Sequence, residues 1–355
     1  MAGHHIGIRS VGLALPPKVR SNDWWPTDVV AKWTAARRPP PPAPANPSPG
    51  MIHVLAALAE QAADPFQGTV ARHVLSDGVT ALDLAEQAGH EALARAGVAP
   101  GDVDLLLTHT VMPDVLLGNP ATQVHHRLGL PRRCLALETD GAAYAFMLQL
   151  SIAEAMIAAG RARLALLVQA CGATPYVDMT DPTSVLFGDG ATAVVVGPVR
   201  EGRGLIAAAH HADGRFANTL VAGVPGGTWA SEGRGLIHVA DPARMREVFL
   251  LTADVCKEGI DAVLGDAGLA PRDITMFAMY QGTPWLRRVV QRYAQLEHAR
   301  SIDSFARTAY LFSAVLPAGL YFAAQEGRIA DGDLVLATGG GTGMTFGSIV
   351  MRWGA

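Results

Sequence analysis

The chain is poor in cysteine, in charge of either sign and in long apolar runs. It has 355 residues but only 3 cysteines, which indicates a reducing, cytoplasmic compartment and no disulfide framework. Charged residues make up 17% of it and the formal net charge is −4, without the basic stripe typical of nucleic-acid binding. No apolar run is long enough to cross a bilayer, and the start lacks the pattern of a secretion signal. We therefore expect neither a nucleic-acid nor a membrane partner.

Metal-ligand spacing is also missing. The histidine pairs His4-His5, His125-His126 and His210-His211 are adjacent in sequence, so their side chains diverge on a strand or a helix. No two cysteines are spaced as zinc ligands are. We predict no metal cofactor.

An internal duplication is the most informative pattern that is present. LAEQAGHEALARAGVAPGDVDLLLTHT (84–110) matches TADVCKEGIDAVLGDAGLAPRDITMFAMYQ (252–281). Downstream, MIAAGRARLALLVQACG (156–172) resembles AAQEGRIADGDLVLATGG (323–340) at nearly the same offset. The first pair shows an amphipathic helix, a Gly/Pro/Asp turn and a buried strand, and both members of the second lead on to an apolar strand. The pattern predicts an α/β fold of two similar halves, each a mixed sheet covered by helices.

The duplication also predicts where a site would lie. We expect a first half at 1–198 and a second half at 199–355, packed about a pseudo-dyad. Equivalent strand ends would then meet near the middle, so His109 and Tyr280 are expected to face a common cleft. The run PPPPAPANPSPG (39–50) interrupts the first half and is predicted to be a flexible surface insertion. The following MIHVLAALAEQAAD is a candidate short helix near the cleft mouth.

The stretch LETDGAAYAF (137–146) joins an apolar strand to a helical pattern. A nucleophile is often found on such a turn, because the helix N-terminus lowers a thiol's pKa and stabilises an oxyanion. Here the turn carries Ala142 and Ala143, flanked by Asp140 and Tyr144. Asp140 is expected to cap the helix, with a role as a buried base as the alternative.

Two further motifs are FGDGATAVVVG (187–197) and ATGGGTGMTFGSIVMRW (337–353). Together with the duplication and the turn, they make nearly the whole chain outside the proline-rich insertion resemble a ketosynthase III. This thiolase-fold family starts or primes fatty-acid and polyketide chains. The resemblance implies two duplicated halves in a layered αβαβα arrangement. It also implies catalysis by a cysteine, a histidine and an asparagine.

This chain departs from that triad at all three positions. The cysteine position falls on Ala143, the histidine on Tyr280 and the asparagine on Tyr310. Three changes at separated places favour natural replacement over an engineered Cys→Ala. Cys171, at the end of the next strand, is the alternative nucleophile, but it has no His or Asn beside it and is expected to be a buried hydrophobe.

A site without the cysteine can still bind an acyl group. Hydrogen-bonding groups are expected from Tyr280, Gln281, Thr283 and Tyr310, and N–H groups from the glycine loop at Gly341 and Gly343. Tyrosine is a poor base near neutral pH but a good donor to an enolate or alkoxide. The alternative is that both tyrosines only fill the space of the lost groups.

The entrance to the acyl-binding pocket is expected at Trp33 and Arg37, in KWTAARR. In the family a tryptophan and an arginine at this spacing hold the adenine and phosphates of coenzyme A. Trp suits stacking and Arg suits bidentate phosphate contact. A solvated helix end is the alternative interpretation.

The leading hypothesis is therefore an acyltransferase or condensing enzyme of polyketide or other specialised metabolism. It would use coenzyme A or the phosphopantetheine of an acyl carrier protein as substrate carrier, without a covalent cysteine intermediate. We expect a homodimer. The rival hypothesis is a catalytically silent subunit that forms a heterodimer with an active ketosynthase.

Overall fold

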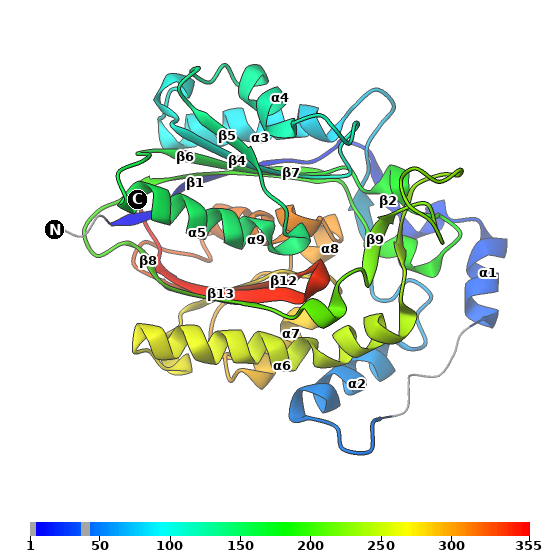
Figure 1. Ribbon diagram of the computed structural model, residues 1–355. Helices are drawn as coiled ribbons and strands as arrows, with labels where there is room; N and C mark the ends of the chain where they lie inside the picture. Colours follow the sequence, from blue (N-terminus) through cyan, green and yellow to red (C-terminus); the bar gives the residue numbers. More distant parts are fainter. Residues whose placement is uncertain (1–4, 37–42) are drawn as a thin grey trace.

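The computed structural model describes residues 5–36 and 43–355, and most of its strands fall into two sheets in separate layers (Figure 1). The first sheet contains β1 (Ile6–Ala14), β4 (Leu105–Val111), β5 (Leu135–Glu138), β6 (Ala165–Cys171) and β7 (Gly190–Pro198), in the order β1-β7-β6-β4-β5. The second contains β8 (Gly204–Ala212), β11 (Met276–Met279), β12 (Leu334–Gly341) and β13 (Thr345–Arg352), in the order β11-β12-β13-β8.

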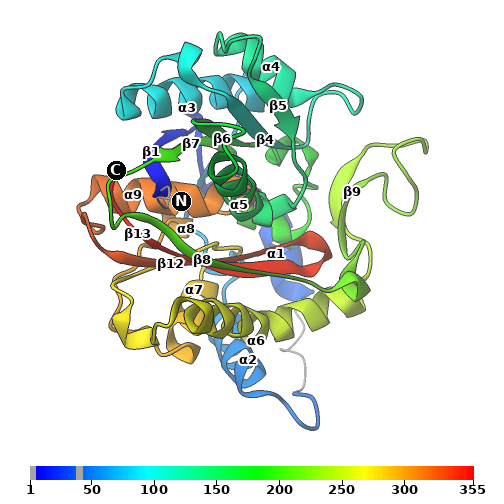
Figure 2. The same ribbon diagram turned by 60° about the vertical axis from the view of Figure 1, so that its left-hand side comes forward.

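Helices lie outside and between these sheets, which makes five layers (Figures 1 and 2). Outside the first sheet are α3 (Ala81–Ala96) and α4 (Pro120–Arg127), and between the sheets are α5 (Ala145–Ala158) and α9 (Val315–Gln325). Outside the second sheet are α2 (Pro49–Gln61), α6 (Pro242–Ala267) and α7 (Leu286–Tyr293). Strand residues on both faces are buried, so each sheet needs cover on both sides. The expected layered α/β fold is confirmed.

The remaining elements are short. The small helices are α1 (Thr27–Ala35) and α8 (Phe305–Thr308), and two-stranded sheets pair β2 (Val19–Ser21) with β3 (Ala71–His73) and β9 (Leu220–Gly223) with β10 (Leu236–Val239). Within the described residues no helix is both long and apolar enough to span a membrane.

The duplication in the sequence is repeated in the backbone. Helices α3 and α6 both end at a left-handed glycine, Gly97 at φ 62° and Gly268 at φ 65°, a conformation that favours glycine. Each is followed by a short 3-10 turn and then a buried strand, β4 or β11. In both sheets the next two strands continue as a parallel and then an antiparallel pair. The same local chemistry therefore builds both halves.

The strands of the first sheet end at Pro198 and those of the second begin at Gly204. This assignment of strands agrees with halves at 1–198 and 199–355, although the boundary itself stays a prediction. Residues 37–42 of the proline-rich segment lie outside the described residues, and 43–48 contain no helix or strand.

The helix expected after the proline-rich segment is α2, but it does not lie where it was expected. Val54 is fully buried in the cluster that α6 and α7 form outside the second sheet. At the start of α2, the Gly50 N–H and the Ser48 hydroxyl donate to the carboxylate of Asp254 on α6. No residue of α2 lines the main cavity described below. The prediction of a helix at the cleft mouth is therefore wrong, because the apolar face of α2 packs against α6.

Candidate active site

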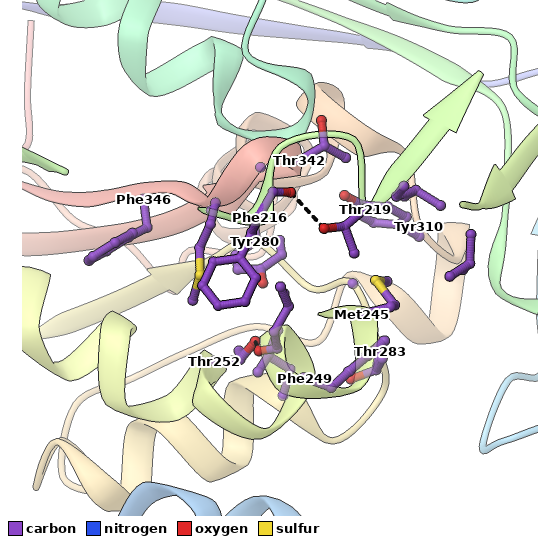
Figure 3. A pocket seen from close by; sticks show the side chains of 18 of the residues that line it. Phe216, Thr219, Met245, Phe249, Thr252, Tyr280, Thr283, Tyr310, Thr342 and Phe346 are labelled. Atoms are coloured by element: carbon purple, nitrogen blue, oxygen red, sulfur yellow. Dashed lines mark hydrogen bonds between the residues drawn. The ribbon is translucent and has the colours of Figure 1, made fainter. Parts of the chain in front are cut away.

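A cavity of about 480 Å³ opens beside the first turns of α6 and the end of the second sheet. Figure 3 shows its labelled side chains, which come from α6, the β12–β13 connection, the segment after β11 and the 216–220 region. Arg246 is the one charged residue among the described residues that line it. The walls are otherwise apolar or neutral, which suits an uncharged, largely apolar ligand.

One wall is a face of α6. Met245, Phe249, Thr252 and Cys256 recur at helical spacing, so their side chains lie on one side of the helix. Asp241 caps the first turn by accepting from the N–H of Arg244 at 3.0 Å, and this fixes where the face begins. The sequence analysis missed this wall. The signal was the apolar periodicity of residues 245–256, which we interpreted only as core packing.

The opposite wall contains the glycine loop between β12 and β13. The lining residues of this loop are Gly340, Gly341, Thr342 and Gly343, and Gly343 has φ 74°. Gly341 packs so closely on the turn at residues 141–144 that an added Cβ would lie 2.3 Å from the carbonyl oxygen of Gly141. Glycine is therefore required there for the two segments to approach. Of the predicted binding residues, Gly341 and Gly343 do line the cavity.

Tyr280 and Tyr310 both line the cavity, and both pack against one apolar cluster of buried residues. A Cβ placed on Gly282 would lie 3.4 Å from the Tyr280 ring and 3.9 Å from the Tyr310 ring. The Tyr310 ring also packs against Phe312, with ring centroids 4.7 Å apart. The structure thus brings two phenols from separate segments to one place.

Burial sets the chemistry of these phenols. Desolvation raises the pKa of Tyr280 well above its usual value, and the neighbouring Cys256 and Tyr310 raise it further, while a hydrogen bond with Thr252 lowers it. Desolvation likewise raises the pKa of Tyr310. Both hydroxyls therefore stay protonated at neutral pH, so they act as hydrogen-bond donors rather than as bases.

Gln281 and Thr283 have different environments. Gln281 is 1% exposed and does not line the cavity, because its amide donates to the Ile302 carbonyl at 3.1 Å and to Ser304 Oγ at 3.0 Å. Thr283 does line the cavity, and its buried hydroxyl has no protein partner. Such an unpaired polar atom is costly unless a ligand or water meets it.

Ala143 is buried at 4% exposure in a 3-10 turn, Ala142–Tyr144, that leads into α5. It is not among the cavity-lining residues, because Gly341 of the glycine loop packs directly against this turn. Asp140 accepts from the N–H of Gly141, the next residue, at 2.7 Å, but neither the turn nor α5 has a side-chain N-cap, so the expectation that Asp140 caps the helix is wrong. The turn is thus adjacent to the cavity but separated from it by backbone.

Two other predicted residues lie away from the cavity. The Tyr144 hydroxyl hydrogen-bonds to Nδ1 of His210 on β8. His109 is buried within β4, two residues before its end, with Nδ1 2.8 Å from the hydroxyl of Ser313. The expectation that His109 and Tyr280 share one cleft is therefore wrong. His109 meets the turn before α9 of the second half, whereas Tyr280 lines the cavity.

The expected entrance is not open at Trp33. This side chain is 7% exposed, donates its ring N–H to the Thr180 carbonyl and packs against Trp25 and Phe66. A ring so enclosed has no free face for adenine, which corrects that prediction for this conformation. Arg37 lies outside the described residues.

The three cysteines are all buried and unpaired by disulfides. Cys171 is fully buried, and desolvation raises its pKa well above the usual value, which confirms it as a buried hydrophobe. Cys256 lines the cavity, but burial raises its pKa to about 12, so it is a poor nucleophile. In the described part of the chain no three His, Cys, Asp or Glu residues gather as metal ligands.

The two layered halves define a thiolase-fold protein with a largely apolar cavity at the end of one sheet. Two family models match the chain: 3-oxoacyl-[acyl-carrier-protein (ACP)] synthase III over residues 137–214, and the C-terminal part of the same synthase over residues 264–353. The chain belongs to the beta-ketoacyl-[acyl-carrier-protein] synthase III family.

Individual relatives agree with this assignment. The beta-ketoacyl-[acyl-carrier-protein] synthase III of Rhodospirillum centenum is 34% identical over 291 residues, which cover 81% of this chain and 88% of the relative. The synthase of Rhizorhabdus wittichii is 34% identical over 284 residues, 79% of this chain and 87% of the relative. The crystal structure of the Pseudomonas aeruginosa synthase III aligns with TM-score 0.80 and 26% identity, covering 99% of both chains.

Proposed function

We propose that this protein binds an acyl thioester of coenzyme A or of an acyl carrier protein and catalyses acyl transfer or condensation without an acyl-cysteine intermediate. The observation that carries the proposal is the pair of neutral phenols, Tyr280 and Tyr310, that line a largely apolar cavity. Family membership supports an acyl substrate, and the apolar walls suit an acyl chain or its carrier arm.

The three family positions carry the mechanism. In the alignment implied by the family motifs, Ala143 takes the place of the nucleophile and the tyrosines take the places of histidine and asparagine. Alanine has no atom that accepts an acyl group. The phenols can donate hydrogen bonds to the oxyanion or enolate that develops when the acyl carbonyl is attacked, and such donors act most strongly in a site without water.

The test is turnover combined with intact-protein mass spectrometry. The purified protein is incubated with malonyl-CoA and acyl-CoAs of graded length, while released CoA and condensation products are followed by chromatography. The expected result is CoA release with product and no adduct on any residue that lines the cavity. An acyl adduct mapped to a cavity-lining residue, Cys256 above all, would contradict the non-covalent mechanism.

The alternative is a silent subunit of an active ketosynthase. The feature that favours a partner chain is an apolar surface on the edge strand β5 and the 115–117 loop. Its members are strongly exposed: Leu135 at 45%, Leu137 at 43%, Val115 at 55%, Leu116 at 62% and Leu117 at 103%. An uncovered edge strand with leucines is suited to pairing with another chain. We infer a dimer through this surface.

Light scattering of the purified protein tests the dimer, with Leu137→Lys as the surface variant. A stable homodimer that turns over acyl-CoA supports the enzyme. An inactive monomer that becomes dimeric only with a cysteine-containing ketosynthase supports the silent subunit instead. A monomer in every mixture would contradict the dimer.

A further inference from the structure

A second set of reactive side chains lies outside the cavity, at Ser313, His109 and Asp140. None of the three lines the cavity. Ser313 is the middle residue of the 3-10 turn Phe312–Ala314 before α9, as Ala143 is of the turn Ala142–Tyr144 before α5. His109 lies near the end of β4 in the first half, and Tyr280, its counterpart in the sequence duplication, directly follows β11 in the second. This set is thus related by the pseudo-dyad to the positions proposed for the lost triad.

One hydrogen bond and one longer charged contact connect these groups in a chain. The Ser313 hydroxyl is 2.8 Å from Nδ1 of His109, and both side chains are buried. On the other side of the ring, Nε2 of His109 is 3.7 Å from Oδ1 of Asp140. A hydroxyl, an imidazole and a carboxylate in this order form the arrangement that activates a serine, because the imidazole accepts the hydroxyl proton while the carboxylate orients the ring.

The backbone around Ser313 also resembles a nucleophile turn. Phe312, directly before it, has φ 50°, a strained value for a bulky residue. The helix that follows, α9, runs for 11 residues, so its positive N-terminal end lies at the serine and favours negative charge there. The turn Ala142–Tyr144 packs against this turn and presents small side chains at Ala142 and Ala143. A strained backbone, the positive end of the α9 helix dipole and a neighbouring base therefore all lie at the Ser313 hydroxyl.

We propose that Ser313 is a nucleophile that accepts a small acyl group from an activated ester or thioester, with His109 as its general base and Asp140 as a positioning residue. This site is separate from the cavity and does not rest on the proposed function. In the first step Ser313 Oγ bonds to the acyl carbon while its proton passes to Nδ1 of His109. The carbon–sulfur or carbon–oxygen bond then breaks, and the leaving thiol or alcohol takes that proton. Water or another hydroxyl releases the acyl group by the same path in reverse.

Of the three side chains only that of Asp140 reaches the surface, whereas His109 and Ser313 are buried behind it. The Asp140 side chain is fully exposed, and Gly141 and Ala142 next to it are half-buried. The Ser313 hydroxyl itself is covered in this conformation, which restricts the site to small acyl groups. Asp140 has a pKa lowered to about 2, chiefly by its hydrogen bond with His109, so the carboxylate stays charged while the reaction proceeds.

The test is labelling of the full chain with diisopropyl fluorophosphate, a small serine-directed reagent, followed by peptide mapping. The expected result is one phosphoryl adduct on the peptide that contains Ser313. Ser313→Ala should abolish it, whereas Ser184→Ala should leave it unchanged, because Ser184 is equally buried and has no hydrogen-bond partner. No adduct on the wild-type chain, or an adduct on a cavity residue, would overturn the proposal.

Three further variants separate chemistry from structure. His109→Gln should slow labelling by about 100-fold or more. Asp140→Asn should slow it about tenfold, less than for a buried triad carboxylate, and Asp140→Glu should restore part of the rate. If Ser313→Ala fails to fold, Ser313→Cys retains a nucleophile and should take up an acetyl group from acetyl-CoA. Unchanged labelling in His109→Gln would contradict the role of the imidazole.

Discussion

Ala143 and Ser313 occupy equivalent places in the two halves, each in the middle of the 3-10 turn that precedes a central helix. The residue before each one has a positive φ, 46° at Ala142 and 50° at Phe312. The turn geometry of the nucleophile is thus present twice, but only Ser313 has a reactive side chain. On the proposed alignment, the turn in the first half has the backbone conformation of a nucleophile turn and carries alanine.

Tyr280→Phe removes one hydroxyl from the cavity and leaves its shape almost unchanged. If the phenol stabilises an oxyanion, kcat/KM for acyl-CoA turnover should fall at least tenfold, equivalent to about 1.4 kcal/mol of transition-state stabilisation. Tyr293→Phe is the control, because that hydroxyl bonds to Asp254 away from the cavity. Equal rates for both variants would favour the silent subunit.

Ala143→Cys returns a thiol to the turn, but we expect it not to restore acylation. Residue 143 is separated from the cavity by the glycine loop, and neutral phenols rather than an imidazole are its nearest proposed partners. Intact mass after incubation with acetyl-CoA should therefore show no adduct on the Ala143→Cys variant. Rapid acylation of the single variant would mean that the thiol reaches the substrate unaided.

Gly341→Ala should destabilise the fold by about 1–3 kcal/mol, the range for overpacking. The new Cβ would lie 2.3 Å from the Gly141 carbonyl oxygen and 3.0 Å from the Tyr144 nitrogen. Gly339→Ala is a matched control on the same strand, since its nearest neighbour, the sulfur of Met147, would be 3.6 Å away. Urea unfolding of both variants measures the difference. Equal urea midpoints for the two variants would show that the glycine loop is not tightly packed against the turn at residues 141–144.

Asp140→Asn should lower the free energy of unfolding near neutral pH and have little effect in acid. The folded-state pKa of Asp140 is lowered to about 2, so its stabilising contribution is present above the unfolded pKa near 4 and is lost as the pH falls toward 2. Because the side chain is fully exposed, the effect should stay below about 1 kcal/mol. The gap in urea midpoints between wild type and variant should narrow from pH 6 to pH 3. A gap that widens on acidification would contradict the pairing with His109.

Cys256 should resist alkylation although it lines the cavity. With a pKa of about 12, only about one thiol in 10⁴ is ionised at pH 8. Iodoacetamide should therefore modify Cys256 slowly in the folded protein and quickly in the urea-unfolded chain. Cys134, whose pKa is also raised, serves as a comparison. Fast modification of Cys256 alone in the folded state would show that the cavity holds a thiolate.

The sequence alone predicted the architecture, because helix and strand periodicities and glycine turns are local signals. Gly97 and Gly268 marked the same helix end in each half, and the repeated order of elements indicated two layered sheets. It also identified Tyr280, Tyr310 and the glycine loop as neighbours, since the family resemblance carries long-range information that periodicity lacks.

Tertiary packing decided which side chains share a space. His109 and Tyr280 are equivalent in sequence, but His109 bonds to Ser313 before α9 whereas Tyr280 lines the cavity. The Trp33 ring is of a type that can stack on adenine, but Trp25 and Phe66 enclose it. The hydrogen bond between Ser313 and His109 joins residues far apart in the chain. Periodicity records which face of an element is apolar, whereas such contacts depend on how the two halves dock, and that is set only by the packed structure.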